Sequence, residues 1–181
     1  MKGTSRILVL LVSTLFMHHN PALSQTSAEL THVRSTFQFM LSAPLHRAAP
    51  LFGPLGERCW AGEHWNPEFL HPQPAKDIEG AVFTVQHGPY RSIWVNTVFD
   101  LSKGRMQYVS FIPDALVSTI DVQLTALDPA TTRVDVAYSR TALTASANDQ
   151  VQQLAASDRT SGPHWQAGIS ACLEKQTSAD R

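Results

Sequence analysis

The sequence predicts an α+β fold, in which a curved antiparallel sheet of about six or seven strands is wrapped on a C-terminal helix and two short helices follow the first strand. Three observations predict it. Segments in which apolar and polar residues alternate recur between residues 31 and 143, and short turns separate them. A stretch rich in Gly and Pro, residues 44–62, interrupts this series with apolar residues at helical spacing. Residues 144–173 show helical spacing as well.

Residues 1–24 have the composition of a secretory signal peptide. Basic residues come first, an apolar run follows over residues 7–17, and the small residues Ala22 and Ser24 stand three and one positions before the predicted cleavage site. The run is shorter than the roughly 20 residues that a spanning helix needs, which argues against the alternative of a membrane anchor. We therefore expect export to the periplasm or the extracellular space, with one mature domain over residues 25–181 and no membrane span in it.

The strands follow from alternation along the chain. The first is predicted at residues 31–41, with Phe37, Phe39 and Leu41 on one face. A short strand is expected around Phe69, because Pro67 and Pro72 keep their neighbours extended. The remaining strands are predicted at residues 80–87, 91–100, 105–112, 117–127 and 132–143. Since the connections between these are short, neighbouring strands should pair antiparallel as a meander.

Two short helices are predicted after the first strand, at residues 45–52 and 55–60. Apolar residues recur at helical spacing in the first, and Gly53-Pro54 separates it from the second. Together these helices should close one end of the curved sheet.

The C-terminal helix is predicted in two pieces. Gly162-Pro163 stands between its two apolar stripes, and inside a helix Gly and Pro cost about 1 and 3 kcal/mol relative to Ala. Pro163 suits the first turn of the second piece. Thr144 or Ser146 is expected to cap the first piece.

Charge limits the range of partners. Removing Lys2 and Arg6 with the signal peptide changes the formal charge from −1 to −3. The remaining basic residues are scattered and form no run, which argues against nucleic acid and against an acidic membrane surface as partners. No feature of the sequence indicates an oligomeric state.

The chain resembles the START/Bet v 1-like superfamily, which is also called the polyketide cyclase/dehydrase and lipid-transport superfamily. The block Leu51–Glu57 resembles an uncharacterised bacterial branch of it. The resemblance rests on Leu51–Glu57, Trp60, Trp65–Leu70, Pro72, Pro74, Gly80–Thr84, Trp94, Tyr138–Leu143, His164, Trp165, Cys172 and Leu173.

This resemblance implies a helix-grip fold with a hydrophobic cavity between the sheet and the long helix. Members bind lipids, sterols, polyketides or other apolar molecules, a few are cyclases or hydrolases, and no catalytic residue is universal. The chain departs from the usual pattern at Gly162-Pro163, where most relatives have one continuous helix.

The mature chain contains two cysteines, Cys59 and Cys172. In an oxidising compartment such a pair can form a disulfide, and the alternative is two buried free thiols. The short helices of helix-grip folds support the far end of the long helix. The resemblance therefore implies that these two residues come within disulfide reach.

The same resemblance implies that aromatic and apolar side chains line a ligand cavity, although each of them could equally be ordinary core. The candidates are Phe52, Trp60, Trp65, Phe69, Phe83, Val95, Tyr108 and Trp165. In the strand over residues 91–100, alternation puts Trp94 on the face opposite Val95, so we expect Trp94 on the outer side of the sheet.

No sequence motif indicates covalent catalysis, a cofactor or a metal. Glu63, His64, Glu68 and His71 lie close together, but their spacing matches no metal-ligand motif, so we interpret them as solvated rim residues.

Two functional hypotheses follow. The first is an exported binding protein for a hydrophobic, lipid-like or polyketide-like small molecule. The second is a cyclase-, dehydrase- or hydrolase-type enzyme that acts in the same cavity. A purely apolar cavity lining would favour the first, and a convergent polar pair would favour the second.

Overall fold

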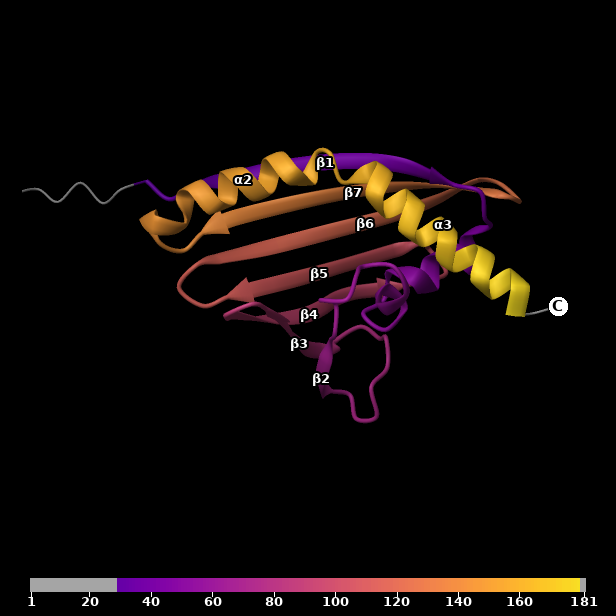
Figure 1. Ribbon diagram of the computed structural model, residues 1–181, viewed down its shortest axis with the longest axis horizontal. Helices are drawn as coiled ribbons and strands as arrows, with labels where there is room; N and C mark the ends of the chain where they lie inside the picture. Colours follow the sequence, from indigo (N-terminus) through magenta and orange to yellow (C-terminus); the bar gives the residue numbers. More distant parts are fainter. Residues whose placement is uncertain (1–28, 180–181) are drawn as a thin grey trace, which may run out of the picture.

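The computed structural model describes residues 29–179, so the predicted signal peptide lies outside the described part of the chain. These residues form one antiparallel sheet of seven strands in the order β1-β7-β6-β5-β4-β3-β2 (Figure 1). Its strands are β1 (His32–Leu41), β2 (Glu68–His71), β3 (Val82–His87), β4 (Tyr90–Asp100), β5 (Arg105–Ile112), β6 (Leu116–Asp128) and β7 (Thr131–Ala142). All seven were predicted, and the observed bounds lie within two residues of the expected ones where a range was given.

The meander prediction is confirmed from β2 to β7, because each of these strands pairs antiparallel with the next. β1 joins the other end of the sheet by pairing with β7, and Phe37 stands opposite Val136. Phe37, Phe39 and Leu41 are all buried, as their alternation predicts. We call the face that they share with the helices the inner face, and the opposite face the outer face.

An irregularity in β4 corrects one prediction. Asn96 pairs with Tyr108 and Val98 pairs with Gln107, so Thr97 is an extra residue in β4. Strict alternation fails across such a bulge. Trp94 and Phe99 therefore both pack against the inner-face core, although their spacing of five residues would put them on opposite faces. The expectation that Trp94 lies on the outer side of the sheet was wrong.

The segment after β1 folds into three short helical turns: α1 (Leu45–Ala48), η1 (Ala49–Phe52) and η2 (Gly56–Cys59). Gly56 is required at the start of η2, because a Cβ atom there would lie 2.1 Å from the Pro50 carbonyl oxygen. The Asp77 carboxylate accepts hydrogen bonds from the backbone N–H groups of Leu55 and Gly56. Asp77, in the loop that follows β2, thus stabilises the N-terminus of η2.

The C-terminal region contains η3 (Ala145–Ala147), α2 (Asn148–Asp158) and α3 (Gly162–Ala179), so the predicted division at Gly162-Pro163 is confirmed. α2 runs along β1 and β7, and α3 crosses the sheet diagonally toward the short helices (Figure 1). Thr144, one of the two predicted caps, is the N-cap residue of η3, which begins this helical segment, but its side chain makes no capping hydrogen bond. Ala147 is the N-cap of α2, and the Thr144 hydroxyl instead donates a hydrogen bond to the Asp114 carbonyl oxygen at 3.0 Å.

The fold therefore has two layers, a curved sheet and the helical segments on its inner face. The main core lies between them and includes residues from β1, β5, β6, β7, α1, η1 and α3. Within residues 29–179, no helix is both long enough and apolar enough to cross a membrane.

Candidate ligand-binding site

Two aromatic clusters occupy the inner side of the sheet. In the first cluster, Trp165 of α3 stands edge-on to Phe37 of β1, with ring centroids 5.2 Å apart, and lies 4.8 Å from the Trp60 ring. Phe52 contacts both tryptophans, and Tyr138 of β7 stacks on Phe37 at 6.4 Å. Helix α3, the short helices and β1 thus meet at one set of rings.

The second cluster covers the β2–β4 end of the sheet. Phe83 stacks between Phe69 at 5.5 Å and Trp94 at 5.9 Å, and Trp65 stands edge-on to Trp94 at 5.4 Å. The Trp65 indole N–H donates to the Pro54 carbonyl oxygen at 2.9 Å, which attaches this cluster to the segment before η2. Trp94 also packs against the main core, so it lies between the two clusters.

The structure brings together seven of the eight aromatic and apolar candidates, in two groups. Phe52, Trp60, Tyr108 and Trp165 belong to or pack against the main core, and Trp65, Phe69 and Phe83 belong to the second cluster. The eighth, Val95, does not join them. It pairs with Val82 and Val109 on the outer face, so its proposed place on the inner face was wrong.

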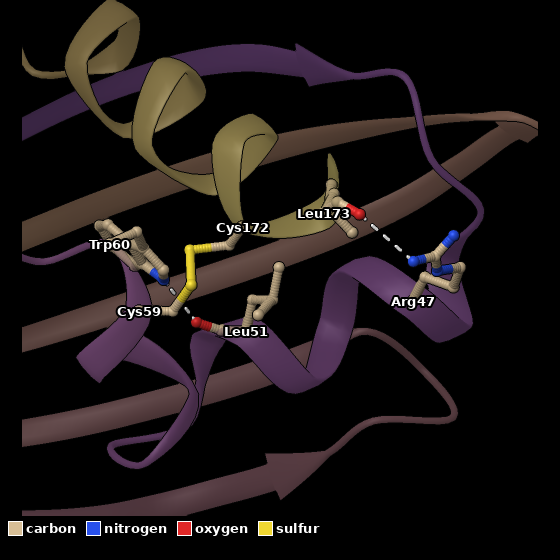
Figure 2. The surroundings of a disulfide bond; sticks show 6 residues. All are labelled: Arg47, Leu51, Cys59, Trp60, Cys172 and Leu173. Carbon is tan, nitrogen blue, oxygen red and sulfur yellow. Dashed lines mark hydrogen bonds between the residues drawn. A yellow bond between two sulfur atoms is a disulfide. The ribbon is translucent and has the colours of Figure 1, made fainter. Parts of the chain in front are cut away.

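A disulfide joins Cys59 of η2 to Cys172 of α3, as predicted, with their Cα atoms 6.1 Å apart (Figure 2). The next residue, Trp60, donates its indole N–H to the Leu51 carbonyl oxygen at 2.7 Å. Further along α3, the Arg47 guanidinium donates to the Leu173 carbonyl oxygen at 3.3 Å. Helix α3 is therefore attached to the short helices at two points, one covalent and one polar.

Glu57 lies on η2, one of the short helical turns that follow β1. Its pKa is raised well above the ordinary value, first because burial removes water from the carboxyl and second because of the negative charge of Asp77. Its charge in turn contributes to raising the pKa values of Tyr108 and Tyr138, on β5 and β7. The carboxyl thus lies within electrostatic range of both tyrosines.

Tyr108 and Asn96 stand opposite each other on β5 and β4. The Tyr108 hydroxyl donates a hydrogen bond to the Phe52 carbonyl oxygen, and burial is the main cause of its raised pKa. Asn96 is fully buried and donates its side-chain amide to the Ile78 carbonyl oxygen at 3.2 Å. Its Oδ1 atom accepts no hydrogen bond from the described residues, which is unusual for a buried polar atom.

An ion pair lies at the other side of the inner face. Arg140 of β7 donates from Nε and Nη2 to the two carboxylate oxygens of Asp158 in α2, at 2.9 and 2.7 Å. Ser35 donates to the same carboxylate, and Arg140 also donates to the Ser118 hydroxyl. The guanidinium carbon lies 4.4 Å from the centre of the Tyr138 ring. These bonds neutralise the charge of Arg140 inside the protein.

Several inner-face side chains are only partly buried, and four of them are Glu57, Trp94, Tyr138 and Trp165. They come from η2, β4, β7 and α3. We call these four residues the inner-face site. The site offers three aromatic surfaces and one carboxyl, so it suits a small molecule with an apolar body and a polar group.

Polar side chains dominate other accessible regions. An open hollow of about 560 Å³ lies over β1, β5, β6 and β7, and its outer-face lining consists of Arg34, Thr36, Gln38, Arg105, Asp121, Gln123, Asp135 and Ala137. Glu63, His64, Glu68 and His71 are exposed, as the rim interpretation expects. Among residues 29–179, no group of three or more His, Cys, Asp or Glu side chains could hold a metal ion.

The polar side chains of the inner face could not be recognised in the sequence. Glu57, Asn96, Tyr138, Arg140 and Asp158 were not candidates, because no motif joins them and they come from four different elements. Tyr138 alone carried a signal, since its alternation with Val134 and Val136 places it inward.

The comparisons with known proteins identify the fold. No protein-family model matches the chain, and no curated protein matches it. A hypothetical protein from Helicobacter pylori is similar in structure, with a TM-score of 0.62, 11% identity, and coverage of 90% of this chain and 99% of that one. Norcoclaurine synthase from Thalictrum flavum has a TM-score of 0.58 at 11% identity, covering 93% and 98%. Ara h 8.0201 has the same TM-score and identity, covering 80% and 99%. With its seven-stranded sheet and C-terminal helices, the chain has the Bet v 1/START-like helix-grip fold.

Proposed function

We propose that the mature protein is an exported binding protein that holds a small molecule with a largely apolar body at the inner-face site. One observation carries this proposal: the large aromatic residues Trp94, Tyr138 and Trp165 pack against the inner-face core but are only partly buried, whereas Phe52, Leu41 and Ile169 of that core are fully buried. Apolar ligand surface that covers these rings leaves water, which contributes roughly 25 cal/mol per Å². Aromatic surfaces with a few polar groups are typical of small-molecule sites.

The compartment is the second part of the proposal. The bridge between Cys59 and Cys172 is of the kind that persists in oxidising compartments. Residues 1–24 have the composition of a secretory signal, and the described residues include no membrane-spanning helix. Together these features support export to the periplasm or the extracellular space.

A second candidate function is an enzyme, and the polar part of the site favours it. The Glu57 carboxyl, with its raised pKa, and the Tyr138 hydroxyl both belong to the inner-face site. Carboxyls whose pKa is raised by burial are typical general acids and bases. The fold is compatible with catalysis, because norcoclaurine synthase has it, and one structure of that enzyme is a complex with dopamine and hydroxybenzaldehyde. We rank this candidate second because, among the described residues, the inner-face site contains no Ser, Thr, Cys, His or Lys side chain beside the carboxyl and the Tyr138 hydroxyl.

The test compares two substitutions on the same strand. Trp94→Arg puts a charge at the inner-face site, whereas Val95→Arg puts the same charge one residue away on the outer face. A panel of hydrophobic small molecules is screened by thermal shift, because a ligand that binds only the folded state raises the melting temperature. We expect hits for the wild type and for Val95→Arg, and none for Trp94→Arg.

Circular dichroism shows whether each variant keeps its sheet. Hits that survive in folded Trp94→Arg would place the ligand elsewhere and contradict the proposal. A wild-type protein that binds nothing in the panel would contradict it as well. Turnover of a bound panel member that is lost in Glu57→Gln would favour the enzyme.

A further inference from the structure

The outer face of the sheet carries an accessible region of its own, the open hollow of about 560 Å³ over β1, β5, β6 and β7. We call it the outer-face hollow. Ala137 has the smallest side chain of its outer-face lining and lies between Thr36 of β1 and Asp121 of β6. Its methyl group leaves room that a longer side chain would fill. The volume lies within the range of small-molecule sites.

The strand register arranges polar side chains of this hollow in a row. Four polar residues are neighbours across four adjacent strands: Gln38 of β1, Asp135 of β7, Gln123 of β6 and Arg105 of β5. Since neighbouring strands lie about 4.8 Å apart, this row spans roughly 14 Å. An amide, a carboxylate, a second amide and a guanidinium thus follow one another at regular spacing.

Hydrogen bonds from neighbouring residues orient three acceptor groups in the hollow. The Asp135 carboxylate accepts from Arg133 Nε at 2.8 Å, and the Asp121 carboxylate accepts from Gln107 Nε2 at 2.7 Å. The Gln123 amide nitrogen donates to three backbone carbonyl oxygens, so its Oε1 atom remains an acceptor. Each carboxylate keeps further capacity to accept, because it has two oxygens with two lone pairs each. These acceptors are therefore in place before a ligand arrives.

Two guanidinium groups supply donors from the outermost of the four strands, Arg34 on β1 and Arg105 on β5. Among residues 29–179, neither side chain forms a hydrogen bond or an ion pair. With Asp121 and Asp135 they give the lining a formal charge of zero, since two cations stand against two anions. Their aliphatic stems add apolar surface beside the polar groups. The lining thus offers donors, oriented acceptors and apolar surface without a net charge.

We propose that the outer-face hollow binds a short linear oligosaccharide that carries no charge. A sugar hydroxyl both donates and accepts hydrogen bonds, so a series of hydroxyls can meet carboxylates, amides and guanidinium groups in turn. The C–H faces of the rings would lie against the aliphatic stems of Arg34 and Arg105. A chain of three pyranose rings is similar in length to the polar row. The hollow and the inner-face site lie on opposite faces of the sheet, so binding at one does not require the other.

Charged and wholly apolar ligands fit the hollow less well. An anion attracted by the two guanidinium groups would also meet the carboxylates of Asp121 and Asp135, and a cation attracted by these carboxylates would meet both guanidinium groups. A wholly apolar ligand would remove the polar groups from water without replacing their hydrogen bonds. A neutral sugar avoids both costs, because its hydroxyls replace water as hydrogen-bond partners.

Nuclear magnetic resonance titration of the isotope-labelled mature protein tests both the place and the class of the ligand. The neutral probes are cellotriose and tri-N-acetylchitotriose. The charged probes are the glucosamine trimer and the glucuronate trimer with the same linkage, and all are compared at mildly acidic pH, where the first is cationic and the second anionic. We expect at least one neutral trimer to shift amide resonances of β1, β6 and β7 and to bind at least tenfold more tightly than both charged trimers.

Two matched pairs of outer-face variants locate the site. Ala137→Gln fills the hollow, whereas Ser139→Gln adds the same side chain two residues further along β7, outside the lining. Asp121→Ala removes an oriented acceptor, whereas Thr119→Ala shortens a side chain of β6 outside the lining. We expect Ala137→Gln and Asp121→Ala each to weaken binding of the neutral trimer at least fivefold, and the two controls to change it less than twofold.

Circular dichroism checks that each variant keeps its sheet. Failure of both neutral trimers to bind the wild type would overturn the oligosaccharide site, and so would a charged trimer that binds as tightly as the neutral ones. Equal losses in Ala137→Gln and Ser139→Gln would place the sugar outside the hollow and overturn it as well. Trp94→Arg should retain the sugar, so the outer-face hollow and the inner-face site can fail separately.

Discussion

Cys59, exposed at the end of η2, and Cys172, buried in α3, are joined by a disulfide although 113 residues separate them in the sequence. The bond attaches the helix that crosses the sheet to the segment that carries Glu57 and Trp60. It thereby holds together two sides of the inner-face site.

Removing this disulfide should destabilise the protein. In the chain-entropy model, a loop of this length contributes about 4 to 5 kcal/mol by restricting the unfolded chain. We expect Cys59→Ala/Cys172→Ala to lower the free energy of unfolding by about that amount in urea denaturation. Reductant should produce a similar loss in the wild type and none in the double variant. A wild-type protein that is insensitive to reductant, with two reactive thiols, would disprove the bridge.

Gly56→Ala should be destabilising, because the new Cβ atom would lie 2.1 Å from the Pro50 carbonyl oxygen. A backbone atom cannot yield as a flexible side chain can, so we expect a cost of about 1 to 3 kcal/mol in chemical denaturation. Gly88→Asn is the control. Gly88 has a φ of +57° that Asn tolerates, and a Cβ atom there would meet nothing within 4 Å. Equal stability of the two variants would show that η2 can shift away from Pro50.

Asp158→Asn should lower the free energy of unfolding by about 3 to 5 kcal/mol. The substitution removes one partner of the Arg140–Asp158 pair and leaves a guanidinium inside the protein without its counter-charge. The two side chains are only 12% and 9% exposed. The surface pair Arg133–Asp135 is the comparison. Its side chains are 42% and 41% exposed, so Asp135→Asn should cost about 1 kcal/mol or less. Similar thermal unfolding curves for the two variants would contradict a structural role for the inner pair.

The raised pKa of Glu57 should make stability depend on pH. A carboxyl whose pKa is higher in the folded than in the unfolded chain binds more protons when folded, so stability decreases as pH rises above the ordinary value of 4.5. The pKa of Asp77 is also raised, so this residue likewise lowers stability as the pH rises above its ordinary pKa of 3.8. The pKa of Asp100 is lowered to about 2, so this residue instead lowers stability as the pH falls below its ordinary pKa of 3.8.

Glu57→Gln should therefore have a higher melting temperature than the wild type at pH 7, and the two should converge toward pH 4. Melting temperatures measured for both proteins across this range test the expectation. A variant that is less stable than the wild type at pH 7 would show that the carboxylate forms a stabilising interaction in the folded protein.

Local patterns along the sequence determined the strands, the short helices and the division of the C-terminal helix. Period-two alternation in β1 and β7 and the Gly-Pro break at residues 162–163 are properties of neighbouring residues, so they could be recognised without tertiary information. The cysteine pairing was also predictable, but only because the resemblance to a fold supplied the distance between two remote elements.

The tertiary structure alone decided which side chains meet at the site. The bulge at Thr97 turned Trp94 inward and left Val95 on the outer face, and alternation cannot reveal such an extra residue. The pairing of β1 with β7 and the packing of α2 brought Arg140 to Asp158. Glu57 looks like an ordinary surface residue in the sequence. It becomes a functional candidate only because folding partly buries its carboxyl and leaves it without a partner among the described residues, and the free energy of a charge depends on its surroundings in space.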